Sequence, residues 1–162
     1  VLVMSAREED YKAVGAAAGL AYSQKVGAES AVDINLAKQL NVVMTQLGVN
    51  ADSIVMNVGS AAVGYGYEYV VSTLDRIKAA ALSQDDKMLQ MPIITPVASE
   101  TWSVKEAMAT EEEAPEWGNQ EVRGVSMEIQ TAAASLASGS DAVILKHPQS
   151  VATISKMIRE LM

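Results

Sequence analysis

The chain of 162 residues contains no cysteine and no phenylalanine, and it has a single histidine. Without cysteine it forms no disulfide, no thiolate metal site and no iron–sulfur ligation of its own. A zinc site, which takes several nitrogen and sulfur ligands, is not expected from one histidine. Any metal chemistry must therefore be brought in by another molecule.

Basic residues are also scarce, with 12 lysines and arginines against 20 aspartates and glutamates and a net charge of −8. Proteins that bind nucleic acid concentrate lysine and arginine on one face, so we expect no nucleic-acid partner. No apolar run approaches the ~20 residues of a membrane span, and the amino terminus lacks a signal-peptide pattern. We therefore expect no membrane partner and a cytoplasmic location. A chain of this length fits one domain, residues 1–162, that buries roughly two-thirds of its unfolded surface.

Apolar runs alternate with helix signals from the first residue onward. Val1 to Met4 is a continuous apolar run typical of a buried strand, and Ser5 and Glu8 have the spacing of a capping box. This pattern predicts a strand that leads into a helix over residues 7–25. Because the chain starts inside the strand and without an initiator methionine, we interpret its amino terminus as truncated.

The same alternation recurs about four more times. Asp33 is the predicted cap of the second helix and Gly48 its stop, and Ser150 is the predicted cap of the last helix. Tyr69, together with Val70, Leu74 and Ile77, is predicted to form the packing face of the third helix. The further expected strands are 29–32, 53–56, 90–94 and 142–145, and the further expected helices are 33–47, 67–82, 124–138 and 150–162.

Alternating strands and helices predict a parallel sheet with helical crossovers. Two architectures satisfy the pattern. An open doubly wound sheet accommodates five such units alone, whereas a TIM-type (β/α)₈ barrel typically takes ~250 residues. By length alone, the open doubly wound sheet is favoured.

The stretch from Met88 to Arg123 starts like a strand and continues for about thirty residues without clear periodicity, and it holds both tryptophans and three of the four prolines. Loops longer than ~12–15 residues are uncommon in compact domains and are usually functional. We therefore expect the working surface of the protein in this segment.

Several stretches, taken in order along the chain, match one known family. They are residues 33–41, 62–69 (Ala-Val-Gly-Tyr-Gly-Tyr-Glu-Tyr), 88–93 (Met-Leu-Gln-Met-Pro-Ile), the pairs Trp117-Gly118 and Arg123-Gly124, and 139–148. Together they resemble the small subunit of the corrinoid iron–sulfur protein, which is called the delta subunit of the acetyl-CoA decarbonylase/synthase complex in methanogenic archaea. The fold of that family is a TIM-type barrel. The resemblance thus implies that this chain forms about the last five strand–helix units of such a barrel, in place of an open sheet.

The resemblance also implies a role in methyl transfer in the acetyl-CoA pathway. In this family a cobalamin-type corrinoid is held between the barrel and the large (gamma) subunit. It accepts a methyl group from a methylated tetrahydropterin and passes it to acetyl-CoA synthase in the complex with CO dehydrogenase. The iron–sulfur cluster belongs to the large subunit, which is consistent with the lack of cysteine here.

In TIM-type barrels the carboxyl ends of the strands and the loops after them form the active face. With the resemblance, this places Trp102 where it would stack on the corrinoid ring, and Thr95, Ser99 and Thr101 where they would donate hydrogen bonds to its amide side chains. The remaining candidates for cofactor binding are Asp33, Asn35, Asn57 and His147.

Each of these residues also has an ordinary structural interpretation. Trp102 can be loop packing, Asp33 a helix cap and His147 an exposed or structural residue. The family holds its corrinoid without a protein histidine on the cobalt, so His147 is not assigned as a metal ligand. No catalytic residue can be named, because no Ser–His–Asp, Cys–His or paired-carboxylate arrangement follows from spacing alone.

Two other functions remain open from the sequence. One is a stand-alone methyltransferase whose barrel rim binds the methylpterin itself through Asp33, Asn35 and Asn57. The other is a purely architectural subunit. A partner is expected on physical grounds as well, because an incomplete barrel exposes apolar strand surface.

Overall fold

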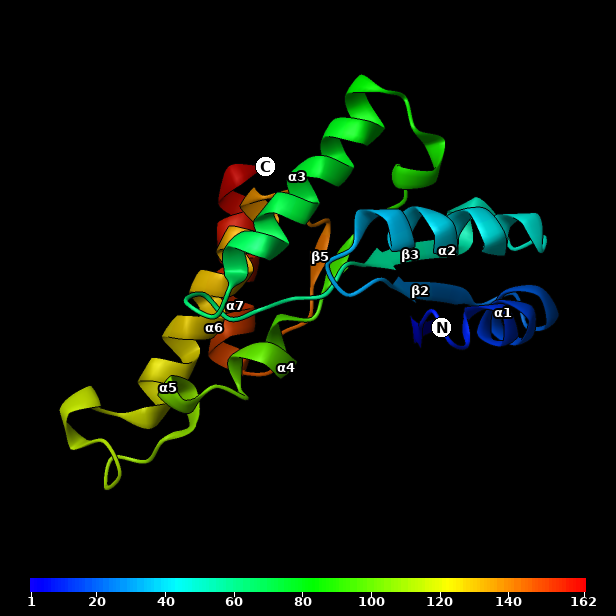
Figure 1. Ribbon diagram of the computed structural model, residues 1–162. Helices are drawn as coiled ribbons and strands as arrows, with labels where there is room; N and C mark the ends of the chain where they lie inside the picture. The colour runs from blue at the N-terminus through cyan, green and yellow to red at the C-terminus, as the bar shows by residue number, and fades with distance from the viewer.

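Five strands, each parallel to its neighbours, form two small sheets in the computed structural model, which describes residues 1–162 (Figure 1). The strands are β1 (Leu2–Ala6), β2 (Lys25–Glu29), β3 (Ile54–Asn57), β4 (Ile94–Thr95) and β5 (Ala142–Val143). The α-helices are α1 (Tyr11–Val14), α2 (Ile34–Gln46), α3 (Tyr67–Ser83), α4 (Val97–Thr101), α5 (Lys105–Met108), α6 (Gln120–Ala137) and α7 (Pro148–Leu161). None of the helices combines the length and apolar composition that a membrane span requires.

The strands lie side by side in the order in which they occur in the chain. One sheet has the order β1-β2-β3 and the other pairs β4 with β5. A parallel bridge between Met56 and Ile93 joins the two, and the Met56 amide donates to the Pro92 carbonyl at 2.8 Å. All five carboxyl ends therefore lie along the same edge. The predicted α/β class with parallel strands is confirmed. The strands do not close into a barrel in this structure.

Two apolar cores hold these elements. The larger core packs β1–β3 against α2 and α3, with Leu40, Ile54 and Leu74 fully buried. A smaller core of Val97, Ala132 and Ile154 joins α4, α6 and α7. Figure 1 shows α6 and α7 side by side, with α3 near them and α1 and α2 beside the first sheet.

Three of the predicted elements are found almost as expected. α2 begins after Asp33, whose carboxylate accepts hydrogen bonds from the amides of Asn35 (2.8 Å) and Leu36 (3.1 Å). It ends before Gly48, which has the positive φ of +100° that favours glycine. β3 and α3 also lie where they were predicted. On α3, however, Tyr69 is 68% exposed, so its place on the packing face was wrong.

The predicted helix over residues 7–25 was wrong in extent and in its cap. Ser5 lies inside β1 with φ +68°, so it is not available as a cap, and the Arg7 amide instead donates to the Asp10 side chain at 2.8 Å. The short α1 continues as a π-helix over Gly15–Ala21. Gly15 and Gly19 lie against Met44 and Val49, and a Cβ at Gly19 would be 2.9 Å from Val49. Glycine at position 19 therefore permits close packing against the residues at and just after the end of α2.

The second strand was predicted four residues too late. It occupies Lys25–Glu29, and Ala31 and Val32, which were expected in it, are two successive residues with positive φ, +47° and +63°, outside the extended region of a strand. Gly27 concealed the strand in the sequence. A Cβ at this position would be 2.8 Å from the Met4 sulfur of β1, so glycine permits the close approach of the two strands.

The last two strands are shorter than predicted. β4 contains only Ile94–Thr95, because Pro92 has no amide hydrogen and Lys87–Leu89 forms a 3₁₀ turn. β5 contains only Ala142–Val143 and is partly exposed, since it pairs on one side only. The predicted helix over 124–138 starts earlier, at Gln120, where the Asn119 side chain caps it.

The cap of α7 is His147 rather than Ser150. The His147 ring nitrogen Nδ1 accepts from the Gln149 amide at 3.2 Å, and Pro148 occupies the first helical position. Ser150 is fully buried, and its hydroxyl has no hydrogen-bond partner.

Candidate functional site

A cavity of about 560 Å³ lies at the edge where the five strands end. Every strand contributes to its wall, either with its last residues or with the loop that follows. Examples in chain order are Ser5, Ala31, Asn57, Pro96 and Ile144. In a parallel α/β protein this is the edge at which ligands bind, so we refer to it as the strand-end cavity.

Polar groups without a protein partner line the strand-end cavity. The Asn57 side-chain oxygen accepts from the Gly59 amide at 3.0 Å, which orients the amide group, and its nitrogen donates to no other protein atom. The Ser60 hydroxyl is buried and has no hydrogen-bond partner at all. A buried polar group without a partner costs about 1–3 kcal/mol, so a ligand that bonds to it regains this energy.

An ion pair between β1 and β2 forms one wall of the cavity. The Arg7 side chain donates from Nε to a carboxylate oxygen of Glu29 at 3.0 Å. The Glu29 side chain is 22% exposed and that of Arg7 is 52% exposed. The sequence interpretation missed both residues, although each stands at or just after the end of a strand. A charged residue at the end of a strand was the sequence signal that could have identified both as residues of the candidate site.

The backbone around the cavity is strained at three residues that are not glycine. Ser5, Ala31 and Val32 all have φ between +47° and +68°, and all three line the cavity. Such conformations cost about 1–3 kcal/mol each and occur most often at functional sites. A β-branched residue such as Val32 adopts one only when its surroundings impose it. The strain therefore indicates that the surrounding structure holds this edge in one specific conformation.

The structure brings some of the predicted site residues to this cavity and leaves others away from it. Asn57 and Ser99 both line it. Asp33 and Asn35 are exposed at the start of α2, outside its lining. Thr95 and Thr101 are fully buried. The Thr95 hydroxyl pairs with that of Ser140 at 2.7 Å, and the Thr101 hydroxyl has no partner.

Removal of the Asp33 side chain tests whether its role is structural. Asp33→Ala should lower the free energy of unfolding by about 1 kcal/mol, because the amides of Asn35 and Leu36 lose their acceptor. Asn35→Ala, a control on the same turn, should change it by less than about 0.5 kcal/mol. Urea denaturation followed by circular dichroism measures both. Equal values for the two variants would contradict the capping role.

A second pocket, of about 370 Å³, lies beside the first around Trp102 and His147. The two rings stack with centroids 6.1 Å apart and an angle of 28° between their planes. The Lys146 ammonium lies 5.3 Å from the centre of the Trp102 ring. Gln120 and Glu121 of α6 complete the lining, so we call it the Trp102 pocket. Ser99 of α4 lines the strand-end cavity, and Trp102, which directly follows α4, lines the Trp102 pocket. The short α4 and the residue after it therefore connect the two pockets.

The segment from Met88 to Arg123 is not the irregular loop that its sequence indicated. It contains α4, α5 and two 3₁₀ turns, and Figure 1 shows its middle part projecting from the molecule. Arg123 joins the carboxyl end of the segment to its middle, donating to the carbonyls of Glu106 and Ala109 at 2.6 Å each. The guanidinium carbon of Arg123 also lies 5.7 Å from the centre of the Trp117 ring.

A hydrogen bond from the Tyr65 hydroxyl to the Glu106 carboxylate joins this segment to the loop before α3. The bond raises the pKa of Tyr65, with desolvation and the Glu106 charge as smaller causes, and it lowers the pKa of Glu106. The contribution of Glu106 to stability is thus present above its unfolded-state pKa and is lost as the pH falls through its lowered folded-state value. The contribution of Tyr65 is present below its usual pKa of about 10 and is lost as the pH rises through the raised value.

Ultraviolet titration of tyrosinate absorbance tests this contact, with Tyr65→Phe identifying the signal of Tyr65. In the Glu106→Gln variant, Tyr65 should ionise at a lower pH than in the unmodified chain, because the hydroxyl loses its carboxylate acceptor. Identical midpoints in the two proteins would show that the contact does not form in solution.

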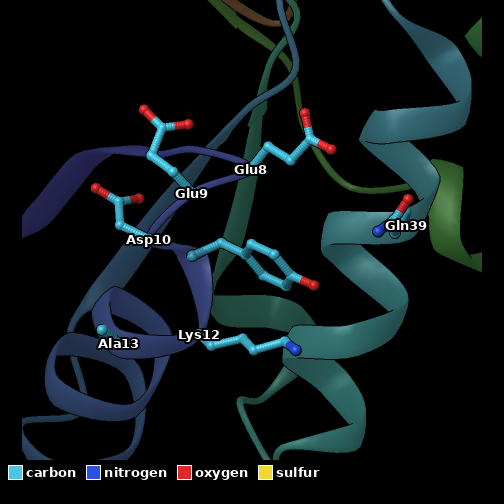
Figure 2. A pocket seen from close by; sticks show the side chains of 7 residues that line it. Glu8, Glu9, Asp10, Lys12, Ala13 and Gln39 are labelled. Atoms are coloured by element: carbon cyan, nitrogen blue, oxygen red, sulfur yellow. The ribbon is translucent and has the colours of Figure 1, made fainter.

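A third hollow, of about 380 Å³, lies at the start of α1 and is shown in Figure 2. Glu8, Glu9 and Asp10 line it on one side, and Lys12 extends from α1 toward the helix that carries Gln39. The Glu8 carboxylate points away from those of Glu9 and Asp10, and no group of three potential metal ligands converges here or elsewhere in the chain. We assign no binding role to this hollow.

The parallel strands and the cavity at their carboxyl edge define an α/β protein with a candidate site at its strand ends. The sequence profile of the family described as CO dehydrogenase/acetyl-CoA synthase delta subunit matches residues 1–157. This chain belongs to that delta-subunit family, as the resemblance in its sequence indicated.

Curated relatives agree with this assignment. The chain is 35% identical over 158 residues to subunit delta 2 of the acetyl-CoA decarbonylase/synthase complex of Methanosarcina acetivorans. The aligned region covers 94% of this chain and 35% of that relative. It is 32% identical over 144 residues to the delta subunit of Archaeoglobus fulgidus (86% of this chain, 31% of the relative). It is 31% identical over 154 residues to the delta subunit of Methanocaldococcus jannaschii (95% of this chain, 36% of the relative). The chain thus spans about a third of the length of these relatives.

Proposed function

We propose that this chain acts within an acetyl-CoA decarbonylase/synthase complex, where its strand-end cavity faces a corrinoid that is carried by the large (gamma) subunit. The observation that carries the proposal is the cavity itself, which residues from all five strand ends line and which contains polar groups of Asn57, Ser60 and Ser99. The named relatives are subunits of such complexes, which supports the same assembly here. In this role the chain helps to enclose the cofactor while a methyl group passes from a methylated tetrahydropterin toward acetyl-CoA synthase.

We further propose that residues 1–162 form one domain and that their five strands are an arc of a TIM-type barrel. The consecutive strand order supports this, since a doubly wound sheet reverses its order at a switch point. In a barrel the strands follow one another around the ring, and ligands bind at their carboxyl ends. The strand-end cavity would then belong to the binding face of the barrel.

The chemistry of the cavity fits a corrinoid, whose edge carries amide side chains. The Asn57 amide nitrogen and the Ser60 and Ser99 hydroxyls are the groups that would bond to them, and the buried Ser60 hydroxyl lacks any other partner. When bound, the corrinoid supplies the cobalt that carries the methyl group. The cavity lining contains no histidine. Because this chain has no cysteine, we assign the iron–sulfur cluster to the large subunit.

The Trp102 pocket extends this proposed surface. Trp102 and His147 stay proposed contacts of the corrinoid. Since the ring of Trp102 already packs on His147 and Gly124, the cofactor would contact only the part of the side chain that these residues leave uncovered. Thr95 and Thr101, both fully buried, would support the strand ends from behind instead of bonding to the cofactor.

Binding of the chain to the corrinoid-bearing large subunit tests this proposal. The double variant Asn57→Ala/Ser60→Ala should bind about tenfold more weakly, because two hydrogen bonds of about 0.5–1.5 kcal/mol each are lost. Asn35→Ala, which removes an exposed amide outside the cavity, is the matched control and should bind as the unmodified chain does. Equal affinity of all three proteins would overturn the placement of the cofactor at this cavity.

A separate titration distinguishes the alternative of a stand-alone methyltransferase. Titration of the chain with a methyltetrahydropterin, in the absence of the large subunit, should show no binding if the cavity serves the corrinoid. Binding that Asn57→Ala abolishes would instead support a methylpterin site on this chain.

A further inference from the structure

One face of α6 supports the whole Trp102 pocket. Glu121, Gly124 and Glu128 are three and four residues apart, a spacing that places them on the same side of a helix. Gly124 lies directly beneath the Trp102 ring, where a Cβ would be 2.4 Å from two ring carbons. Glu121 reaches the His147 ring, with 3.1 Å between its Oε1 and the imidazole Nε2. This face of α6 therefore contacts both rings of the pocket, the Trp102 indole and the His147 imidazole.

Glu128 is the buried member of this face, with an exposed fraction of 0%. Its two carboxylate oxygens accept from the backbone amides of Lys146 (2.6 Å) and His147 (3.2 Å). No basic side chain forms a salt bridge with it. A buried carboxylate is costly unless it is hydrogen-bonded, so these two amides, at the amino end of α7, compensate its burial.

The two hydrogen bonds fix the turn from which Lys146 and His147 extend. His147 is then held at both ring nitrogens, since Nδ1 accepts from the Gln149 amide and Nε2 faces Glu121. An unprotonated Nδ1 requires that the neutral ring carries its hydrogen on Nε2. The imidazole stacks on Trp102 in this orientation, and the Lys146 ammonium lies over the same indole.

We propose that Glu128 is a positioning residue of the Trp102 pocket. Its buried carboxylate holds the Lys146–His147 backbone so that both side chains lie against Trp102 and present one fixed surface to the ligand. This role rests on the proposed function only for the identity of that ligand, the corrinoid. The positioning itself is a property of this chain and can be measured without the cofactor.

Amide hydrogen exchange in the unmodified chain gives the first test. The Lys146 and His147 amides should exchange slowly and resonate downfield, because each donates to a buried carboxylate. Exchange of both amides at the rate of an open loop would overturn the proposal. This measurement needs no variant, so it holds even if a substitution prevents folding.

The Glu128→Gln variant gives the second test, because it keeps the size of the side chain and replaces one acceptor oxygen by a donor group. It should accelerate exchange of the Lys146 and His147 amides by about tenfold or more and shift the Trp102 indole and His147 ring signals. The Met56 amide in β3 should be unchanged, since a global loss of stability would accelerate exchange there too. Glu121→Gln, the control on the same face, should leave both amides protected. A Glu128→Gln protein with unaltered Trp102 and His147 signals would overturn the proposal.

The cobalt absorption spectrum of the complex separates this inference from the function on which it rests. If the unmodified chain changes that spectrum, Glu128→Gln should reduce the change, as Trp102→Ala should. A full change with Glu128→Gln would overturn the positioning role toward the corrinoid. If the unmodified chain causes no change, the proposed function fails, and the amide measurements alone decide whether Glu128 positions the turn.

Discussion

Gly124→Ala is expected to displace Trp102 and to lower the free energy of unfolding by about 1–3 kcal/mol, the usual cost of overpacking. The reason is geometric, since a Cβ at this position would be 2.4 Å from two carbons of the indole ring. α6 is anchored in the core at Val125 and Ala132, so the ring must move rather than the helix. Its stacking with His147 is then lost, and the fluorescence of Trp102 should change together with stability.

Gly15→Ala is the matched control for this substitution. A Cβ at Gly15 would lie 3.4 Å from Met44, within ordinary contact distance, and its φ of −61° suits any residue. Glycine is less favourable than alanine in a helix by roughly 0.5–1 kcal/mol, so this variant should be as stable as the unmodified chain or slightly more stable. If Gly124→Ala behaved like Gly15→Ala in chemical denaturation, the close packing of Trp102 on α6 would be contradicted.

Arg123→Ala is expected to release the projecting segment between α4 and α6 and to cost about 2 kcal/mol or more of stability. Its guanidinium donates to the carbonyls of Glu106 and Ala109 at 2.6 Å and to that of Gly118 at 3.3 Å. Hydrogen bonds from a charged donor are worth about 1.5–3 kcal/mol each, and partial exposure reduces that value here. The part of the chain that they join should become a preferred site of proteolysis.

Limited proteolysis of Arg123→Ala and of Arg159→Ala compares the two substitutions. Arg159 is exposed on α7 and makes no hydrogen bond or salt bridge, so its removal should leave the cleavage rate unchanged. Cleavage between residues 103 and 119 should be faster in Arg123→Ala alone. Resistance of that variant at the level of the unmodified chain would show that the segment is held by other contacts.

The elements that the sequence predicted well carry their signals locally. α2 has an aspartate cap at its start and a glycine stop at its end, and both signals lie within the helix region itself. The elements that were misplaced depend on distant contacts. β2 starts at Lys25 because Gly27 packs on Met4 of a neighbouring strand, and a propensity argument does not register such a contact.

The cap of α7 was within reach of the sequence. His147 precedes Pro148, and proline is favoured at the first helical position, so the residue before it is the natural cap. The prediction chose Ser150 by its residue type alone. Ser150 is instead fully buried at the start of the helix, where its hydroxyl has no partner.

The candidate site was predictable in its position but not in its detailed composition. Parallel strands place their carboxyl ends at one edge, and this rule led to Asn57 and Ser99, which both line the strand-end cavity. The rule does not reveal that Thr95 points into the core, since this depends on its pairing with Ser140, 45 residues later. Nor does it reveal that Glu128, in the middle of a helix, holds the turn after β5.

The central claim is that the strand-end edge of this chain faces the corrinoid of the large subunit. The most direct measurement is the cobalt absorption spectrum of that subunit, titrated with the unmodified chain, with Trp102→Ala and with Asn35→Ala as the control. The account predicts a spectral change with the unmodified chain that Trp102→Ala weakens and Asn35→Ala leaves intact. A spectrum that the unmodified chain does not alter, or a change that is equal in all three titrations, would contradict it.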